Sequence, residues 1–504
     1  MAFVQNFPFI SILLSLFAGP ISSILSGKWA KRLNLAVITV IGAMSAMILA
    51  FVWRSGQEYI YTMGHFPAPW GNEIRVGVLE AAMALFFCII MFLSVIGGAL
   101  ERELEIEATK QNLYYIMVNL LLCSLLALIY TNDLFTAYVF VEINTISACG
   151  LIMIRQTGRT IEAATRYMIM SLLGSGLLLL GICFLYSLTG HLLMSNIKEH
   201  AALIQASGEY HIPLLIAICL ISVGIAIKSA LYPFHTWLPD AYGYSTLSSA
   251  AILSALVSKG YIFLLVKIFY RVVGFDIIRD SKVINVLFVF GIAGMIMGSV
   301  NAIKENDINR MIAYSSVAQI GYIYMGFGLG TTAGMIASIY HIVSHAATKS
   351  LLFVAASGIT DASSKSKNFF DLTGAGYRNK LAGVAFTVGS LSMVGFPMFS
   401  GFISKLLFAQ AAVGVGNRYK IMITLIALAI SVILNAVYFM KTVIRIYTPE
   451  KSTVVIDKGF QEINAWEQPA KSAALVCFIA LNLLLGLSSE PVIALIERGL
   501  AMFA

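Results

Sequence analysis

Long, nearly uninterrupted apolar runs dominate the 504-residue chain and predict its fold class. A helix needs about 20 mostly apolar residues to cross a bilayer. Fourteen such runs occur, near 6–25, 33–53, 77–99, 113–130, 134–154, 167–188, 213–239, 246–270, 283–303, 311–329, 333–357, 381–411, 421–440 and 471–489. Because the runs are continuous rather than alternating, a membrane β-barrel is excluded. The pattern therefore predicts an all-α polytopic membrane protein with about 14 transmembrane helices.

Composition and charge agree with a membrane environment. Of all residues, 59% are hydrophobic and only 12% are charged, as in multi-span membrane proteins. The net charge of +8 could indicate a nucleic-acid partner, but nineteen of the 33 Lys and Arg residues fall in one set of alternate loops and helix ends, nine in the other set and five inside the runs. Cytoplasmic loops carry this excess of positive charge. We therefore expect a multi-pass protein of the cell membrane with both termini on the outer side and no nucleic-acid partner.

Ionisable residues inside the runs are the first candidates for function. Glu142 lies near the middle of the fifth run, and Lys228, Lys259 and Lys405 lie in the seventh, eighth and twelfth. A charge at the bilayer centre costs about 2.5–3.5 kcal/mol by insertion measurements, so such residues usually face the bundle interior and serve a transport path. Lys267, closer to the end of the eighth run, is expected to extend its amine to the membrane interface instead.

The eleventh run contains HIVSHAATK, in which His341, His345 and Lys349 are spaced four residues apart and share one helix face. Haem would need axial ligands from opposite sides, and a metal would need further ligands, so we expect neither a cofactor nor a metal. A one-sided ladder of imidazoles and an amine suits proton transfer through hydrogen-bonded water. The alternative is a set of interhelical hydrogen bonds involving Ser344 and Thr348.

Two runs contain helix breakers. Pro233 lies inside the seventh run, and Pro397 lies inside the twelfth together with Gly395. Proline removes a backbone hydrogen bond, and the freed carbonyls need other partners. Along the sequence, Pro233 follows residue 113 by nearly the same number of residues as Pro397 follows residue 283. This correspondence predicts two five-helix repeats, helices 4–8 and 9–13, that are inverted because five is an odd number, with helices 7 and 12 discontinuous.

The repeats divide the chain into an N-terminal three-helix segment, two units that each hold a proton half-channel, and a C-terminal loop with the last helix. Their expected bounds are 1–112, 113–270, 283–440 and 441–504.

The stretch IKSALYPFHTWLPDAY combines a lysine with a helix break, and the break gives water and polar backbone access to the membrane midplane. If Glu142 meets Lys228, the pair can act as a switch: when their contact loosens, the lysine passes its proton on to Lys259. Lys405 would be the exit beyond the ladder of the eleventh run. We expect His341 and His235 to be secondary relay positions.

Four motifs in order, KSALYPFHTWLPDAY, the SKG of the next run, HIVSHAATKSLLF and GFPMFSGFISKLLF, resemble the antiporter-like subunits shared by respiratory complex I, Mrp-type cation/proton antiporters and membrane-bound hydrogenases. The match covers roughly residues 110–445. It implies a fourteen-helix fold with two inverted five-helix repeats and a proton path along the midplane. The resemblance places the family's functional positions, in chain order, on Glu142, Lys228, Lys259, His345, Lys349 and Lys405. Some members carry a glutamate at the last position, where this chain has a lysine.

The segment MGHFPAPWGNEIRVGVLEAAMALF, residues 63–86, resembles the D-type antiporter proteins of Mrp complexes and hydrogenase-type proteins more than complex I subunits. In contrast, AYGYSTLSSAAILSAL, residues 241–256, replaces the His- and Pro-containing sequence usual in the family, which leaves the inner mouth of the first half-channel open to question.

The expected function is proton translocation, or cation/proton antiport, within a multi-subunit energy-converting complex. Its other membrane subunits, with a hydrogenase or another redox module as an open possibility, would be the partners. Whether Na⁺ is also carried stays open. Alternatives are a proton-pumping subunit of a complex I-type NADH:quinone oxidoreductase, a quinone- or haem-binding redox subunit, and a scaffold with no active channel.

Overall fold

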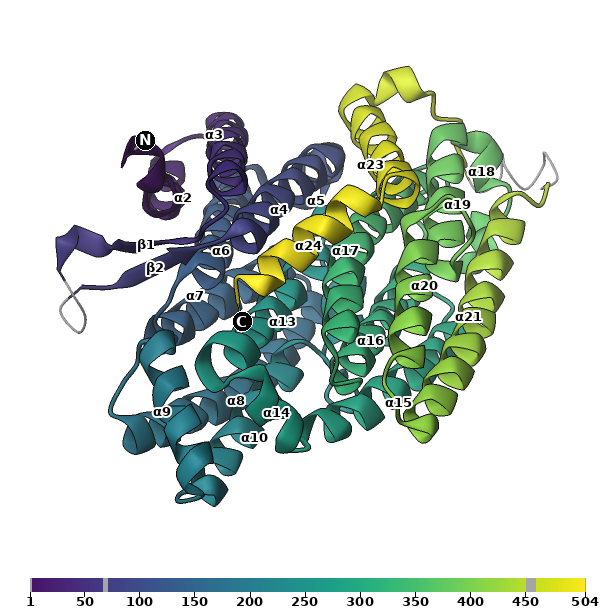
Figure 1. Cartoon of the computed structure of the whole chain (residues 1–504). Helices are drawn as coiled ribbons and strands as arrows, with labels where there is room; N and C mark the ends of the chain where they lie inside the picture. The colour runs from purple at the N-terminus through teal and green to yellow at the C-terminus, as the bar shows by residue number, and fades with distance from the viewer. Residues whose placement is uncertain (1, 67–70, 450–458, 504) are drawn as a thin grey trace.

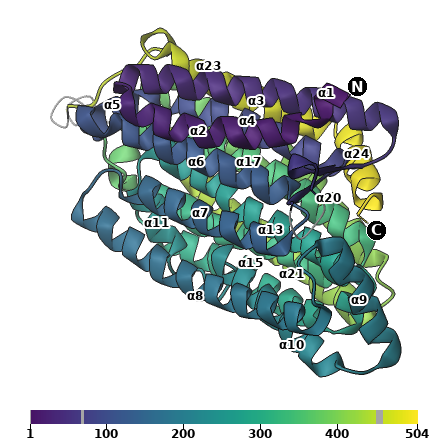
Figure 2. The same cartoon turned by 90° about the vertical axis from the view of Figure 1, so that its left-hand side faces the viewer.

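The computed structural model describes residues 2–66, 71–449 and 459–503. Long helices lie side by side and nearly parallel through the molecule (Figure 2). The N-terminal part comprises α1 (Ala2–Gln5), α2 (Phe7–Ile24), α3 (Gly27–Ser55), β1 (Tyr59–Thr62), η1 (Met63–His65), β2 (Glu73–Val76), α4 (Val78–Gly97), α5 (Ala99–Glu105) and η2 (Ala108–Lys110). The first predicted repeat comprises α6 (Gln111–Tyr130), α7 (Leu134–Met153), α8 (Gly158–Thr189), α9 (Met194–Ser207), α10 (His211–Lys228), α11 (Leu238–Tyr244), α12 (Leu247–Ile252), η3 (Leu253–Val257), α13 (Ser258–Lys267) and η4 (Ile268–Val273).

The remaining elements follow the same pattern of long helices joined by short ones. After α14 (Phe275–Asp280), the second predicted repeat comprises α15 (Val283–Lys304), α16 (Ile308–Gly328), α17 (Thr332–Asp361), η5 (Phe369–Leu372), α18 (Ala375–Arg378), α19 (Lys380–Val394), α20 (Ser400–Val413) and α21 (Arg418–Ile446). The C-terminal part comprises η6 (Ala465–Glu467), α23 (Pro469–Leu487) and α24 (Glu490–Ala501). Elements η3 and η4 are π-helical and continue the helix formed by α12 and α13.

The all-α membrane architecture predicted from the apolar runs is confirmed. In the described part of the chain, 12 helices are long and apolar enough to cross a membrane. The other two predicted runs correspond to α16, which is more polar, and to the shorter pair α19 and α20. An antiparallel hairpin, β1–β2, which the sequence analysis did not predict, connects α3 to α4 with Tyr59 opposite Val76.

Two spans form the centre of the bundle. The most apolar windows of Leu247–Val273 and Thr332–Asp361 are 100% buried, whereas those of α3 and α21 are only 33% buried. The outer helices therefore present apolar side chains to the surroundings, and the central spans are enclosed by protein. Because the eighth and eleventh runs form these central spans, the ionisable residues predicted in them lie inside the bundle.

Both predicted helix breaks are present. Helix α10 ends at Lys228, and the chain is not α-helical again until Leu238. The indole of Trp237 donates to the carbonyl of Ile227 across this gap, at 3.2 Å. In the second break, α19 ends before Gly395, whose φ of 95° reverses the chain as L side chains rarely can. A break thus interrupts the fourth membrane segment of each predicted repeat, while the inverted relation of the repeats stays a prediction.

The two ends of the described chain lie at one end of the bundle. In Figure 2, α1 and α24 lie at the same end of the long helices, and Figure 1 shows α24 crossing that end over α13 and α17. This agrees with termini on one side, while the identity of that side stays a prediction from the charge bias. Lys451 and Lys458, which contributed to that bias, and residues 67–70 of the family-like segment lie outside the described residues.

Candidate functional site

Glu142 and Lys228 come together across helices α7 and α10. The Lys228 Nζ lies 4.0 Å from the Glu142 carboxylate; the lysine side chain is fully buried, and the glutamate is 27% exposed. The amine donates to the Thr145 hydroxyl at 2.8 Å and lies 5.4 Å from the centre of the Tyr261 ring. Since Lys228 is the last residue of α10, the break lets its amine reach a carboxylate and a hydroxyl in the interior.

Lys259 lies at the first turn of α13, directly after the π-helical turn η3. Its buried amine donates to the carbonyl of Ser254 within that turn. A π-turn widens the helix and frees carbonyl oxygens, which is why such turns recur at functional sites. Element η3 also packs against α17, so Lys259 belongs to the segment that faces the histidine helix.

His341, His345 and Lys349 occupy one buried face of α17, as predicted. The two imidazole rings are stacked with centroids 5.7 Å apart. His341 Nδ1 lies 2.5 Å from the Ser404 hydroxyl, and both ring nitrogens of His345 lack a hydrogen-bond partner in the described structure. Lys349 donates to the carbonyl of Ile312 at 2.9 Å. The His345 nitrogens are therefore not committed to another group of the described structure.

Lys405, on α20, adjoins the same face of α17. Its amine donates to the carbonyl of Met393 at 2.7 Å, one of the carbonyls that the second helix break frees. The amine also lies 5.6 Å from the centre of the Tyr322 ring, which stacks on His341 at 5.4 Å. Lys405, Tyr322, His341 and His345 thus form a continuous series of neighbours, with the lysine at the end expected for the exit.

The close approach of Lys405 to Gly395 gives a testable prediction. A Cβ on Gly395 would lie 2.9 Å from Lys405 Cδ, and the residue holds a left-handed φ of 95°. We expect Gly395→Ala to strain the break and displace the amine from the Met393 carbonyl, which would lower proton transport severalfold in assembled complexes. Gly416→Ala is the matched control, because Gly416 also has a positive φ, 74°, with open space around its Cβ position. Equal transport loss in both variants would contradict a specific role for the Lys405 contact.

The alternative interpretation of α17 was a set of interhelical hydrogen bonds involving Ser344 and Thr348. Such bonds are also present, on a neighbouring face of the helix. Ser344 donates to Ser400 at 2.8 Å, and Thr348 accepts from Asn482 of α23 at 3.0 Å. These contacts tie α17 to the second break and to the last long helix. They involve neither His341 nor His345, so the hydroxyl network and the imidazole ladder coexist.

His235 is separate from these contacts. It lies in the first break, 8% exposed, and stacks on Tyr232 with centroids 5.2 Å apart. Its Nδ1 has no hydrogen-bond partner among the described residues. Pro233, as predicted, lies in the same non-helical segment, and Pro397 lies in the corresponding segment after Gly395. The structure thus places His235 at the first break, with its relay role still a prediction.

Comparison with known proteins decides the family. The sequence profile of the family described as NADH:quinone oxidoreductase/Mrp antiporter, TM, matches residues 131–431, more than half of the chain. The chain belongs to this antiporter family. It is a multi-pass, antiporter-like, proton-translocating membrane subunit of the type found in Mrp- and complex I-like assemblies.

Relatives and solved structures of the antiporter family extend over nearly the whole chain. NADH-quinone oxidoreductase subunit N of Desulforudis audaxviator (strain MP104C) is 31% identical over 447 residues, which cover 88% of this chain and 86% of the relative. A chain of the archaeal membrane-bound sulfane sulfur reductase superposes with a TM-score of 0.86 at 24% identity, covering 100% of this chain and 98% of the other. A chain of the Mrp complex from Dietzia sp. DQ12-45-1b gives 0.86 at 21% identity, with coverage of 99% and 97%. The structural likeness establishes the antiporter-family fold.

The prediction that Lys267 extends its amine to the membrane interface is wrong. Its side chain is fully buried, so it does not extend to the membrane interface. The amine donates to the carbonyls of Leu128, Ile129 and Thr131 at 3.2, 2.8 and 2.5 Å. These carbonyls end helix α6, where a cation is favoured by the helix dipole. The position of Lys267 near the end of its run was misleading because α6 and the hairpin cover that end.

Arg271 forms a buried ion-pair cluster that the sequence analysis did not predict. It lies in η4 and is 1% exposed, with ion pairs to Glu58 at 2.8 Å and Glu80 at 2.9 Å. Glu80 is fully buried at the first turn of α4. The spacing of these three residues along the chain did not predict the cluster. Glu58 reaches Arg271 only because the chain folds into the hairpin that follows Glu58.

Proposed function

We propose that this subunit moves protons laterally through its interior from Glu142 and Lys228, by way of Lys259, to the face of α17 and out at Lys405. The observation that carries the proposal is the contact between the fully buried Lys228 and Glu142, 4.0 Å apart beside a helix break. A buried amine close to one carboxylate and one hydroxyl can exchange between a paired and a released state. The two proposed half-channels correspond to residues 113–270 and 283–440.

The proposed order of transfer rests on neighbouring contacts. Tyr261, whose ring faces Lys228, lies on α13 two residues after Lys259. Element η3 brings the Lys259 segment against α17, where His345 and His341 stack toward Tyr322 and Lys405. In this proposal His235 and His341 are secondary relay positions, and His345 and Lys349 belong to the main path.

We further propose that the chain works in a multi-subunit complex, as the D-type antiporter protein of an Mrp assembly or its counterpart in a membrane-bound hydrogenase, at the cell membrane with both termini outside. The segment 63–86 favours this type, and the likeness to chains of the Mrp complex and of the sulfane sulfur reductase is compatible with it. The 31% identity to an NADH-quinone oxidoreductase subunit N supports a complex I-type assembly as the second candidate.

Glu142→Gln tests the proposed switch, because it removes the carboxylate charge and keeps the side-chain shape. We expect coupled proton transport to fall at least tenfold in the assembled complex, since Lys228 would lose the charge that holds it. Glu142 is 27% exposed, so the neutral side chain should not disturb folding or assembly. Glu162→Gln is the control, because Glu162 pairs with exposed Arg166 outside the proposed path.

The measurement is proton uptake in proteoliposomes, with assembly checked by the co-purifying subunits. Unchanged transport in Glu142→Gln would favour the scaffold alternative, because a scaffold has no use for the carboxylate.

A further inference from the structure

Two basic residues near the end of α21 are not used by the proposed proton path. Lys441 and Arg445 lie four residues apart, so they are neighbours on one face of the helix. Neither forms an ion pair within residues 2–66, 71–449 and 459–503; Arg445 lies over the Phe370 ring at 5.2 Å. Two cations without carboxylate partners are therefore available to an anion.

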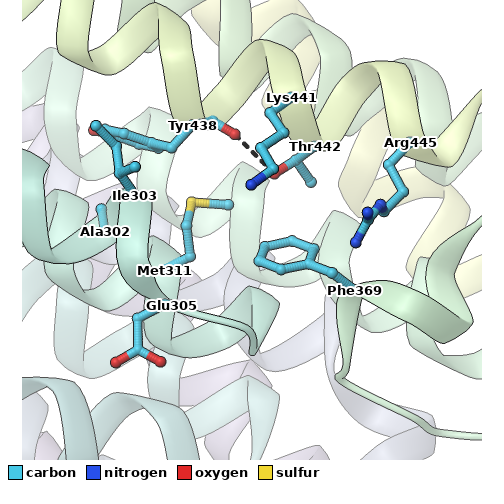
Figure 3. A pocket seen from close by; sticks show the side chains of 9 residues that line it. All are labelled: Ala302, Ile303, Glu305, Met311, Phe369, Tyr438, Lys441, Thr442 and Arg445. Atoms are coloured by element: carbon cyan, nitrogen blue, oxygen red, sulfur yellow. Dashed lines mark hydrogen bonds between the residues drawn. The ribbon is translucent and has the colours of Figure 1, made fainter.

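On one side, the pair borders a small cavity that Met311, Phe369 and Tyr438 also line. Figure 3 shows both basic side chains reaching from α21 toward this cavity. Glu305 lines the same cavity, but its carboxylate points away from them and binds Arg310 at 3.1 Å. The local charge at the cavity mouth is thus positive.

On the other side, the same pair lines the C-terminal half of an open groove along α21. Its lining includes Val437, Met440 and Ile444, and the side chains of Val437 and Ile444 are 45% and 67% exposed. The groove is therefore apolar along the helix and cationic at one end.

The length of α21 places this cationic end at the depth of lipid headgroups. The helix has 29 residues, which at about 1.5 Å per residue exceeds the roughly 30 Å hydrocarbon core of a bilayer. Lys441 and Arg445 lie in its last two turns, and the apolar groove extends from them toward the core. An amphiphile with a phosphate at one end and acyl chains at the other has the same distribution of charge and apolar surface.

We propose that this surface binds an anionic phospholipid, with its phosphate between Lys441 and Arg445 and an acyl chain in the groove past Met440 and Val437. The inference is independent of the proton path, because none of these side chains is assigned to it. A protein partner on the same groove would need carboxylates to neutralise both cations. A phospholipid supplies the phosphate and the apolar chain in one molecule.

The test uses the assembled complex in nanodiscs of phosphatidylcholine with or without phosphatidylglycerol, and native mass spectrometry counts the retained lipids. The double variant Lys441→Gln/Arg445→Gln should bind phosphatidylglycerol about 25-fold more weakly, about fivefold for each lost charge. Arg418→Gln, an exposed residue at the other end of α21, is the matched control and should retain the lipid. In the wild type, phosphatidylglycerol should also slow amide exchange over residues 436–448.

Equal retention of phosphatidylglycerol by the double variant and the wild type would overturn the proposal, as would equal retention of the two lipids by the wild type. Protection of residues 436–448 by inorganic phosphate alone would assign the site to a free anion instead. Cross-linking of Lys441 to another subunit, with no dependence on phosphatidylglycerol, would assign the surface to a protein partner.

Discussion

Replacing Lys228 with alanine is expected to abolish coupled proton transport while the protein still folds and assembles. The variant removes the amine that contacts Glu142 and Thr145 at the end of α10. Without it, the first proposed half-channel loses the amine that pairs with Glu142 at the break. Folding should persist because Glu142 is 27% exposed and the hydroxyl of Thr145 also bonds the carbonyl of Val141 at 2.9 Å.

The variant Lys228→Arg tests whether Lys228 must release its proton or only supply a positive charge. A guanidinium keeps the positive charge, but it does not release its proton in proteins. If Lys228 is only a structural partner for Glu142, the arginine should preserve much of the transport. If the lysine must give up its proton, the arginine variant should be as inactive as the alanine variant. Proton flux into proteoliposomes that contain the assembled complex distinguishes these outcomes.

Lys420→Ala is the matched control for both variants. Its amine donates to the carbonyl of Gly328 at 2.7 Å, and neither residue is assigned to the proposed path. We expect normal transport in this variant, which shows that loss of one helix-associated lysine is tolerated. Transport at wild-type level in Lys228→Ala would refute the mechanism.

Much of the architecture was predictable because a bilayer imposes strong constraints on sequence. Apolar runs of sufficient length have few alternatives to helices, and Pro233 and Pro397 marked the two breaks. The charges predicted to lie inside, such as Lys259 and Lys349, are buried because their runs form the enclosed centre of the bundle. The features that could be predicted from the sequence are therefore those that the lipid bilayer imposes on any spanning segment.

The contacts between distant segments were not predictable in this way. Tyr322 and Ser404 join Lys405 to the histidine face, and neither residue is distinguished by charge or spacing. The π-turn that offers the Ser254 carbonyl to Lys259 has no signature in the apolar pattern. The burial of Lys267 was missed because it depends on α6 and the hairpin, which cover the end of its helix.

Removing the guanidinium of Arg271 is expected to have the largest effect on stability. Its side chain is 1% exposed, is paired with Glu58 and Glu80, and lies over the Phe503 ring at 4.1 Å. Arg271→Met would keep much of the packing volume but leave Glu80, which is fully buried, without its ion-pair partner. Breaking one partner of a buried pair costs about 3–5 kcal/mol. We therefore expect a large fall in the melting temperature of the purified complex.

A second substitution can show that the unpaired carboxylate causes this loss. Adding Glu80→Gln to Arg271→Met removes the buried charge, so the double variant should recover a large part of the lost stability, whereas Glu58 still has Arg75 as an ion-pair partner. Arg279→Met is the control: its side chain is 53% exposed and pairs with Asp276 at 3.0 Å on the surface. Such pairs contribute about 0–1 kcal/mol, so this variant should melt close to the wild type. If Arg271→Met melts at the wild-type temperature, the cluster does not hold the hairpin and α4 against the central helix.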